Sequence, residues 1–340
     1  MIHALLEGGI EESYVNIISQ MYLNLKARVV TDVEGDYFDI SRGVKQGDPL
    51  SPLIFNIALE KIFKKLQWEN KGLKINGVFL NNLRFADDKV LIAKNFEELK
   101  EMMIELNRES KEAGLEINMT KTKIISKNKN ETLKIGDLEI ENVKEIVYLG
   151  QLISLENDSK KEIDRRISLT WRKFWSLRWI LKGNFSKSLK GEILNTCVFP
   201  VLTYGAQTWA YTRKSENKLN ATQNSMIRSI LGVKKSDKIR TKTLKSKIPN
   251  LKNIMYEIRR LKWDWAGHIS RIKDDRWGYR TLFWEPKHKR KKGAQKMRWG
   301  DAISSFLMNK QFTRVATDRL EWARLREAFA RNQRAGRVYS

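Results

Sequence analysis

The sequence predicts an α+β fold, in which a first half of mixed strands and helices is followed by a helical, strongly basic second half. Two observations support this prediction. Up to about residue 155, short apolar runs bounded by turn residues alternate with helical patterns, and from residue 156 the apolar residues recur at helical spacing. The net charge of +25 is also divided unevenly, because residues 1–155 carry −3 and residues 156–340 carry +28.

The first predicted elements are a hairpin, a loop and a helix. Residues 26–40 have apolar runs on both sides of Gly35, which predicts a hairpin with its turn at that glycine. The Gly- and Pro-containing stretch 41–52 predicts a loop. We expect a helix to follow, with Ser51 as its N-cap, Pro52 at the first helical position, and one apolar face made of Leu59, Ile62, Phe63 and Leu66.

A second hairpin and a second helix come next. Residues 78–86 and 90–93 are short apolar segments on either side of Asp87 and Asp88, so both acids are expected at a hairpin tip. A helix is expected from Asn95 to about Ala113, with Gly114 as its left-handed stop. Its inward side chains are predicted to be Phe96, Leu99, Met103 and Leu106. Shorter strands are expected near residues 116–117, 123–125 and 146–153.

The second half opens with a long basic helix. Its apolar stripe is predicted to consist of Ile163, Ile167, Trp171, Phe174, Leu177 and Leu181, and the basic residues off that stripe are Arg165, Arg166, Arg172 and Lys173. A basic amphipathic helix can lie on a membrane. We expect this helix instead to pack inward and to present its charges to a nucleic-acid duplex. The run at residues 287–296 predicts a charged linker or arm.

Composition excludes several classes of protein. Hydrophobic residues make up 41% of the chain, which is enough for a core and excludes a disordered protein. A single cysteine, Cys197, excludes an intrachain disulfide, and one Cys with three His does not make a zinc knuckle. No apolar run reaches the roughly 18 residues that span a bilayer, and the first residues lack the layout of a signal peptide. We therefore expect an intracellular protein that is neither secreted nor in a membrane.

The basic half predicts a polyanionic partner. It contains ten of the eleven tryptophans, so aromatic rings are interleaved with positive charges. This combination is typical of nucleic-acid binding. The alternatives are a solvated basic surface or a basic tail that binds membranes.

Asp87 and Asp88 are the residues most suited to chemistry. Nucleotidyl transfer uses two divalent metals about 3.5–4 Å apart, held by carboxylates that converge at one point. Mg²⁺ prefers oxygen ligands, which adjacent aspartates at a hairpin tip supply, with Ala86 leaving room for a primer end. More often, an Asp pair in a turn serves only to stabilise the turn through hydrogen bonds to the backbone.

The loop at residues 42–52 adds a second signal. Gly43 and Gly47 allow the backbone to approach a nucleotide closely, Gln46 offers an amide to a base or sugar, and the following helix N-terminus favours anions. The alternative is an ordinary capped loop.

Together and in this order, these segments resemble the reverse transcriptases of LINE-type (non-LTR) retrotransposons. The similarity lies in four segments: RGVKQGDPLSPLIFN (residues 42–56), LRFADD (83–88), GLEINMTKTK (114–123) and YLG (148–150). The C-terminal pattern of WAGH (265–268), RW (276–277), WEP (284–286) and RWGD (298–301) is similar to the tail of the same element proteins. The resemblance covers nearly the whole chain and implies an RNA-directed DNA polymerase.

The resemblance also implies roles for individual residues. Asp87 and Asp88 become the catalytic, metal-binding carboxylates, with Mg²⁺ or alternatively Mn²⁺ as the cofactor and dNTPs as substrates. Lys121 or Lys123 becomes the acid that protonates the leaving group, with a solvated charge as the alternative. Nucleotide and template contacts are implied for Arg42, Gly43, Gln46, Gly47, Pro49, Phe85 and Ala86, and a primer grip for Tyr148, Leu149 and Gly150. Arg84 is expected to touch a nucleic-acid phosphate or to form a salt bridge within the sheet.

On this resemblance the chain has three parts. Residues 1–155 are a partial polymerase palm, residues 156–235 a helical thumb, and residues 236–340 a basic, Trp-rich nucleic-acid-binding region. The expected partners are an RNA template and a DNA primer or target, without a membrane. The expected location is the nucleus and cytoplasm, and the basic run at residues 287–292 resembles an import signal.

One catalytic residue of the family has no counterpart in this sequence. Its members have a further aspartate on an earlier palm strand, in a Phe-Asp-type motif, whereas Asp32, Asp36 and Asp39 lie in the hairpin before the loop and outside such a motif. We therefore expect an N-terminally truncated protein that polymerises poorly or not at all. The alternative is a catalytically inactive nucleic-acid-binding remnant. An RNA-directed RNA polymerase is less favoured, because those enzymes usually have Gly where this chain has Ala86.

Overall fold

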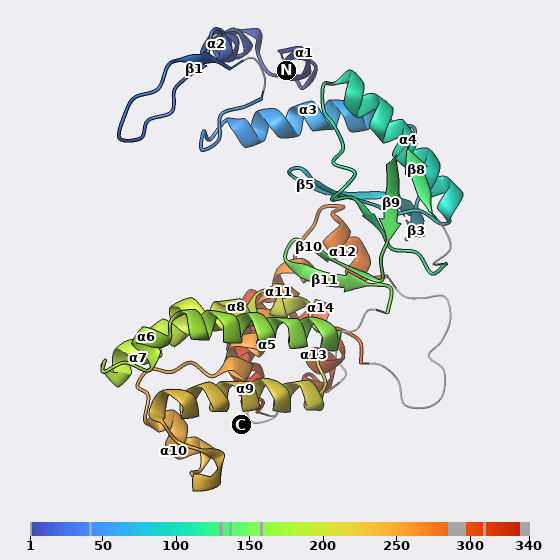
Figure 1. The fold of residues 1–340 in the computed structure, drawn as a ribbon. Coiled ribbons are helices and arrows are strands. Elements are labelled where there is room, and N and C mark those ends of the chain that lie inside the picture. Colours follow the sequence, from blue (N-terminus) through green and yellow to red (C-terminus); the bar gives the residue numbers. More distant parts are fainter. Residues whose placement is uncertain are drawn as a thin grey trace. The chain divides into compact units, whose positions relative to one another are not determined.

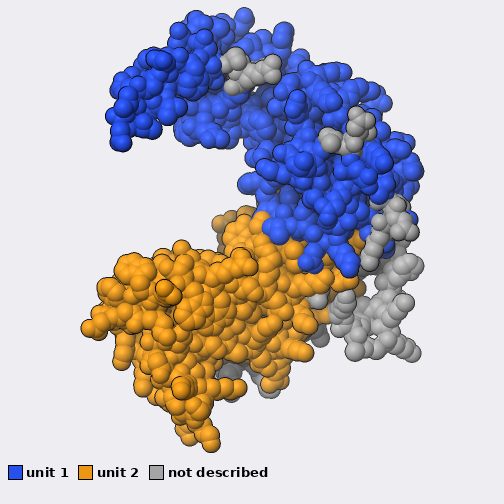
Figure 2. All heavy atoms as spheres, viewed as in Figure 1, with its two compact units in different colours: residues 1–149 blue, residues 150–340 orange. Residues whose placement is uncertain are grey.

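The computed structural model describes residues 2–40, 43–128, 132–135, 138–156, 159–284, 297–308 and 311–333 (Figure 1). The chain forms two compact units, unit 1 at residues 1–149 and unit 2 at residues 150–340, which Figure 2 colours separately. Unit 1 combines helices with small sheets, and unit 2 is mainly helical. The predicted α+β class is therefore confirmed. The predicted further division near residue 235 stays a prediction.

Unit 1 contains four helices among its described residues: α1 (Ile2–Glu7), α2 (Glu12–Tyr22), α3 (Ser51–Lys65) and α4 (Phe96–Glu112). Its strands are β1 (Lys26–Ala27), β2 (Phe38–Asp39), β3 (Leu73–Ile75), β4 (Val78–Leu80), β5 (Asn82–Phe85), β6 (Asp88–Leu91), β7 (Lys123–Ile124), β8 (Leu133–Ile135), β9 (Leu138–Asn142) and β10 (Glu145–Tyr148). β1–β2, β3–β4 and β5–β6 are antiparallel hairpins, and β9 pairs with both β7 and β8. Only the β7–β9 pairing of these is parallel.

The core of unit 1 is built around α3 and α4. Their shared cluster consists of the buried residues Leu59, Ile62, Leu66, Trp68, Met102 and Leu106. The other side of α4 packs on the β7–β9–β8 sheet through Met103, Ile124, Leu133 and Ile140. Trp68 is fully enclosed, and its indole Nε1 donates to Glu105 Oε2 at 2.9 Å. α4 is thus the central support of this unit.

Most predicted elements of unit 1 are present, with differences at their ends. α4 begins after Asn95, whose side chain accepts a hydrogen bond from the Glu98 amide, and Gly114 has a left-handed φ of +74°. Ser51 is not the N-cap of α3: the helix already includes it, and its hydroxyl donates to the Lys45 carbonyl at 2.6 Å. The expected strand at residues 78–86 is divided into β4 and β5.

Three further differences concern strands. The expected strand at residues 116–117 is absent from the described structure, and β3, β8 and β9 were not predicted. The expected strand at residues 146–153 is broken into β10 and β11 by a turn at Leu149 and Gly150, both of which have positive φ. The boundary between the two units falls in this turn.

Unit 2 begins with β11 (Gln151–Ser154) and continues almost entirely in helices. These are α5 (Ser159–Ser176), α6 (Arg178–Leu181), α7 (Lys187–Ile193), a π-helical turn η1 (Leu194–Val198), α8 (Phe199–Thr203), a 3₁₀ turn η2 (Ala206–Thr208), α9 (Arg213–Leu231), a 3₁₀ turn η3 (Lys235–Asp237), α10 (Thr241–Ser246), α11 (Ile254–Ser270), α12 (Trp277–Leu282), α13 (Asp301–Phe306), α14 (Phe312–Val315) and α15 (Arg319–Ala330). The predicted basic helix corresponds to α5 and α6.

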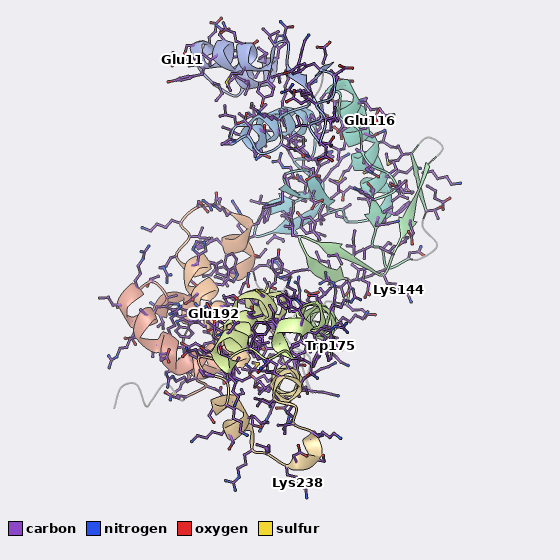
Figure 3. All side chains as sticks on the ribbon, turned by 60° about the vertical axis from the view of Figure 1, so that its left-hand side comes forward. Glu11, Glu116, Lys144, Trp175, Glu192 and Lys238 are labelled. Atoms are coloured by element: carbon purple, nitrogen blue, oxygen red, sulfur yellow. The ribbon has the colours of Figure 1, made fainter. Side chains whose placement is uncertain are left out.

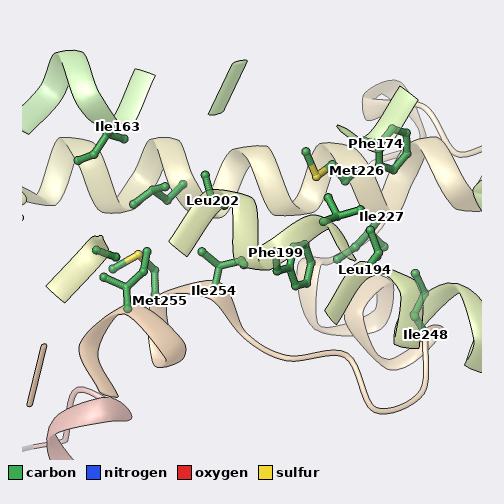
Figure 4. Close-up of a cluster of buried hydrophobic side chains, with 14 of the residues drawn as sticks. Ile163, Phe174, Leu194, Phe199, Leu202, Met226, Ile227, Ile248, Ile254 and Met255 are labelled. Atoms are coloured by element: carbon green, nitrogen blue, oxygen red, sulfur yellow. The ribbon is translucent and has the colours of Figure 1, made fainter. Parts of the chain in front are cut away.

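The largest core cluster lies in unit 2, and Figure 4 shows part of it. It brings together apolar residues of α5 to α11, including Ile163, Phe174, Leu202, Met226 and Ile254. The whole predicted stripe of α5 and α6 takes part, since Ile167, Trp171 and Leu177 pack against the same cluster and Leu181 is fully buried. The inward packing predicted for this helix is confirmed.

A second core joins α11 to α15. The rings of Trp263 and Trp322 stack with centroids 3.8 Å apart, and each indole Nε1 donates to the other residue's backbone carbonyl, at 3.0 and 3.2 Å. A Cβ added at Gly267 would lie 2.3 Å from Trp322 Nε1. Gly267 of the WAGH motif is therefore explained by close packing.

A buried cation lies beside this core. Lys262 of α11 is 1% exposed, and its ammonium donates to the Trp209 carbonyl at 2.6 Å. The rings of Tyr211 and Trp299 lie 5.2 and 5.1 Å from that nitrogen. Trp299 donates its own indole hydrogen to the Gln207 carbonyl at 2.6 Å. We call Lys262 with Trp209, Tyr211 and Trp299 the lysine box.

No helix in the described ranges is both long enough and apolar enough to cross a membrane. Cys197 is exposed on η1. The predicted arm at residues 287–296 and the Glu285-Pro286 part of the WEP motif lie outside the described residues.

Candidate functional site

The Asp87-Asp88 pair lies at a tight β-turn. β5 and β6 pair antiparallel with Phe85 opposite Asp88, so Ala86 and Asp87 are the two turn residues and Asp88 opens β6. Ala86 has φ +51°, a left-handed conformation that a residue with a Cβ seldom adopts but that two-residue hairpins require. Both carboxylates are exposed. The predicted hairpin with acids at its tip is confirmed.

The two faces of this hairpin differ. Residues directly opposite in an antiparallel pair point to the same face, so Arg84 and Lys89 share one face and Phe85 and Asp88 the other. Arg84 donates to Glu60 of α3 at 2.8 Å and lies over the Phe63 ring, 4.4 Å from its centroid. α3 therefore covers the Arg84 face. Phe85, at 63% exposed, and Asp88 occupy the opposite face.

Arg84 thus follows the second of its two expected roles. It forms an ion pair within unit 1, with Glu60 of a helix rather than with a residue of the sheet. The aromatic ring beneath it and the carboxylate beside it fix the strand against α3. A phosphate contact by Arg84 would have to compete with both.

Sequence reasoning missed Lys89. Burial lowers the pKa of Lys89, and the charges of Asp87 and Asp88 oppose that shift. Its ammonium lies 3.5 Å from the Asp87 carbonyl oxygen. Lys89 is thus a cation next to two carboxylates, and its position directly after the acid pair was the available signal.

Tyr148 is the one predicted primer-grip residue that the structure brings to the acids within unit 1. Burial raises the pKa of Tyr148, and the negative charge of Asp88 raises it further. The phenol therefore stays protonated at neutral pH and remains a hydrogen-bond donor beside the acid pair. Leu149 and Gly150, with φ of +47° and +73°, form the turn after it.

The loop before α3 exposes its polar groups. Gly43 and Gly47 have φ of +91° and +88°, and no atom lies within 4 Å of a Cβ built on either. Gln46 and Pro49 are exposed. Asp48 stiffens the loop, since its Oδ1 accepts a hydrogen bond from the Leu50 amide at 2.9 Å. Arg42 lies outside the described residues.

α3 connects this loop to the acid-bearing hairpin. The loop ends at Ser51, and Arg84 of β5 binds Glu60 nine residues later. At 1.5 Å per residue, these two points are about 14 Å apart along the helix axis. One rigid helix therefore fixes the separation of both candidate segments.

The two lysines expected as acids differ in surroundings. The Lys123 ammonium lies 2.5 Å from Glu141 Oε2 of β9. Lys121 is exposed and forms no ion pair among the described residues. Its amide is held by the Asn118 side chain at 3.1 Å. Lys121 is the one of the two whose ammonium is available to a ligand.

The acid pair fits a hard divalent cation in part. Two adjacent exposed carboxylates are the oxygen donors that Mg²⁺ binds, with its other positions left to water and substrate phosphates. In the described part of the chain there is no group of three or more Asp, Glu, His or Cys residues arranged to hold a metal. Asp87 and Asp88 would therefore hold a metal through two carboxylates.

Gly150 begins unit 2 and is firmly held there. Arg165 and Arg166 of α5 both donate to its carbonyl oxygen. The Arg166 guanidinium, 6% exposed, also binds Glu162 at 2.6 Å and lies 4.4 Å from the centre of the Tyr204 ring. The expectation that Arg166 faces a duplex is wrong, because its charge is buried and fully used inside the protein.

A different part of α5 and α6 does present charge outward. Arg172 and Trp175 lie one turn apart on α5, Trp179 lies on α6 and Lys182 is its C-cap residue, and all four are exposed. Trp175 and Trp179 are 48% and 65% exposed. Figure 3 labels Trp175 on this helix. We call these four residues the aromatic–basic face.

Comparison with known proteins gives a consistent family signal. Residues 3–153 match the family described as reverse transcriptase (RNA-dependent DNA polymerase). A putative uncharacterized transposon-derived protein of Caenorhabditis elegans is 29% identical over 268 residues, which are 74% of this chain and 96% of that protein.

Polyproteins of retrotransposable elements are also similar. A retrovirus-related Pol polyprotein from the type-1 retrotransposable element R2 of Nasonia vitripennis is 38% identical over 103 residues, which are 30% of this chain and 10% of the polyprotein. The R2 polyprotein of Bradysia coprophila is 31% identical over 126 residues, 37% of this chain and 14% of that protein. The matched segments thus span a small part of the R2 polyproteins.

Proposed function

Because the chain belongs, through residues 3–153, to the reverse transcriptase family and is similar there to R2 non-LTR retrotransposon polyproteins, we propose that it acts in RNA-directed DNA synthesis with Asp87 and Asp88 at the reaction centre. The observation that carries this proposal is the β5–β6 turn, which holds two exposed carboxylates side by side on a hairpin braced by α3.

The reaction is two-metal nucleotidyl transfer. Asp87 and Asp88 would hold Mg²⁺ or Mn²⁺, which supplies Lewis-acid activation of the primer hydroxyl and charge neutralisation on the triphosphate. The primer 3′ oxygen attacks the α-phosphorus of a dNTP, the bond to pyrophosphate breaks, and the hydroxyl proton leaves to solvent. Lys121 protonates the departing pyrophosphate oxygen.

The remaining predicted residues position the substrates. Gly43 and Gly47 allow close approach of backbone to the nucleotide, with Gln46 donating to its base or sugar. Phe85, Ala86 and Pro49 line the path of the template and primer. Tyr148, with Leu149 and Gly150, acts as the primer grip. Arg42 keeps its predicted template contact as part of the same proposal.

The partners follow from the chemistry of both units. An RNA template and a DNA primer or target are the substrates of this reaction, and the aromatic–basic face suits unpaired bases, because exposed indoles stack on bases while flanking cations bind phosphates. On this proposal the protein works in the nucleus and the cytoplasm.

The chain by itself should extend a primer weakly. Two carboxylates at the turn leave two metal ions under-coordinated. The second candidate function, a catalytically inactive nucleic-acid-binding protein, is favoured by the same observation.

Primer extension on an RNA template with dNTPs tests the proposal. The chain is assayed with Mg²⁺ and with Mn²⁺ beside its Asp87→Asn and Asp88→Asn variants. Extension, however weak, should vanish in both variants, whereas RNA affinity should not fall, because removing a carboxylate reduces the repulsion of a polyanion.

Asp36→Asn is the matched control, because Asp36 is an exposed acid of unit 1 outside the turn. Equal extension by the Asp87→Asn variant and the unaltered chain would overturn the assignment of the acids. Absence of extension in every protein, with salt-sensitive RNA binding in all of them, would favour the inactive binding protein.

A further inference from the structure

A separate surface of unit 2 has an unusual concentration of uncompensated charge. Residues 233–249, which we call the basic lobe, join α9 to the segment before α11 and include η3 and α10. Figure 3 shows Lys238 at the tip of this lobe. The lobe contains seven basic residues and one acid: Lys234, Lys235, Lys238, Arg240, Lys242, Lys245 and Lys247, with Asp237.

The single acid does not neutralise this charge. Asp237 is occupied by the backbone, since its Oδ2 accepts a hydrogen bond from the Lys234 amide at 2.9 Å. In the described structure none of the seven basic side chains forms an ion pair, and six are exposed. Burial lowers the pKa of Lys245, the one half-buried member. The lobe is therefore a dense positive surface without internal counterions.

The lobe is nevertheless an ordered part of unit 2. Leu244 of α10 is fully buried and Ile248 is 2% exposed, both in the main core. A Cβ added at Gly191 of α7 would lie 2.6 Å from the Pro249 carbonyl oxygen, so α7 and the end of the lobe pack closely.

The segment after the lobe is fixed as well. Asn195 donates to the Asn250 carbonyl at 2.8 Å and accepts from the Lys252 amide at 3.0 Å. Gln223 of α9 donates to the Lys252 carbonyl at 2.6 Å. The charges are thus presented on a fixed backbone, which reduces the entropy lost on binding a regular partner.

The basic lobe lacks aromatic and large exposed apolar side chains, and this restricts the kind of partner that it can bind. Residues 233–249 contain no aromatic residue, and their larger apolar side chains, Ile239, Leu244 and Ile248, are committed to the core. A protein interface would need an exposed apolar centre, and membrane insertion would need an exposed apolar face. Unpaired bases would need rings on which to stack. A partner that offers regularly spaced phosphates and no exposed bases fits best.

We propose that the basic lobe binds the phosphate backbone of a nucleic-acid duplex, independently of its sequence. That the partner is a nucleic acid rests on the proposed function. That it is a duplex is inferred from the positive charge of the lobe, its fixed backbone and its lack of aromatic rings. The duplex has the higher phosphate density, and phosphate contacts position a protein without reading sequence.

Duplex affinity measured across a series of KCl concentrations tests this proposal on the full chain. The variant replaces Lys234, Lys235, Lys238 and Lys242 by Gln, and the probe is a DNA duplex of arbitrary sequence. Each lost phosphate contact should lower the steepness of the log–log salt dependence by about 0.9. A fall of about 2 or more, with weaker binding at low salt, is expected for the four substitutions.

The matched control replaces four exposed lysines of unit 1, Lys64, Lys100, Lys111 and Lys144, by Gln. It removes the same charge and should leave the salt dependence nearly unchanged. Equal effects in both variants would overturn the lobe as a site, since only net charge would then matter. Binding of single-stranded oligonucleotides should fall less than duplex binding, and an equal fall would contradict the duplex assignment.

An RNA–DNA hybrid in place of the DNA duplex separates the two sources of duplex. Loss of binding to either one in the lobe variant supports the proposal and says which is bound. The measurement does not require polymerisation, so a chain that never extends a primer would refute the proposed reaction and leave this proposal standing.

Discussion

At the scale of single residues, Asp87 and Asp88 were predicted from the sequence, whereas Lys89 was missed. Two acids between apolar runs indicate a hairpin tip from the sequence alone, and the turn has this form. The lowered pKa of Lys89 arises from burial, which depends on tertiary packing. The sequence also left Arg84 with two roles, because a guanidinium suits a phosphate and a carboxylate equally well; its neighbour Glu60 is remote in sequence.

Which of Lys121 and Lys123 can act as the general acid likewise depends on the ion pairs that each lysine forms. Lys123 is paired with Glu141, so its loss should weaken the β7–β9 region slightly and leave the reaction intact. We predict that Lys121→Ala lowers the rate of nucleotide addition by about 10²-fold or more, as expected for loss of a general acid, with RNA affinity unchanged. Single-turnover extension measures this rate.

Lys123→Ala is the control for that measurement. If it slows addition as much as Lys121→Ala, the assignment of the acid to Lys121 is wrong.

At the scale of elements, helices were predicted better than strands. α4 has an N-cap at Asn95 and a left-handed stop at Gly114, both local signals that act within one turn. β8 and β9 were missed although Leu133, Ile135, Leu138 and Ile140 alternate with polar residues on either side of Gly136 and Asp137, which is a signal for a short hairpin. The parallel pairing of β9 with β7 joins strands that are not adjacent in the sequence, and no local pattern predicts it.

In α5, helical periodicity predicted an exposed position for Arg166, and this prediction was wrong. Arg166 lies beside the apolar stripe, yet it is buried because Glu162, Tyr204 and the Gly150 carbonyl surround it. We predict that Arg166→Met destabilises unit 2 by about 2 kcal/mol, because Glu162 would keep a buried charge with Arg165 as its remaining cationic partner. Urea unfolding followed by circular dichroism measures the change.

A double variant distinguishes charge from packing. Glu162→Gln with Arg166→Met removes both charges and should recover part of the lost stability. No recovery would mean that the guanidinium acts by packing on Tyr204 rather than by neutralising Glu162. Arg172→Met, on the exposed side of the same helix, should change stability by no more than about 0.5 kcal/mol.

At the scale of the whole molecule, the uneven charge along the sequence was the better guide. The division between −3 and +28, set at residue 155, lies close to the boundary of the two compact units at residue 149. The distribution of charged residues can be counted along the sequence and needs no knowledge of the fold. The lysine box was not predictable, because Lys262, Trp209 and Trp299 meet only in the folded unit.

The lysine box should make stability depend on pH. Burial lowers the pKa of Lys262 to about 7, although the charge of Asp301 opposes the shift. Between pH 7 and 10.5 the unfolded chain therefore holds this proton more tightly than the folded one. The free energy of unfolding should rise with pH in this window, by up to about 1.4 kcal/mol per pH unit from this group.

Chemical unfolding from pH 7 to 9 measures that slope. Lys262→Met keeps most of the side-chain volume and removes the titrating group, so its slope should be smaller by that amount. Lys238→Met, in the exposed loop after η3, should retain the full slope. A Lys262→Met protein with an unchanged slope would show that the buried ammonium does not titrate in this range.

The distribution of tryptophan has an optical consequence. Trp68 is the single tryptophan of residues 1–149, and the other ten lie in residues 150–340. Intrinsic fluorescence excited at the indole band therefore reports mainly on unit 2, whereas far-ultraviolet circular dichroism reports on the helices of both units. If the two signals change at different denaturant concentrations, the units unfold as separate cooperative blocks, and each can be assigned its own stability without cutting the chain.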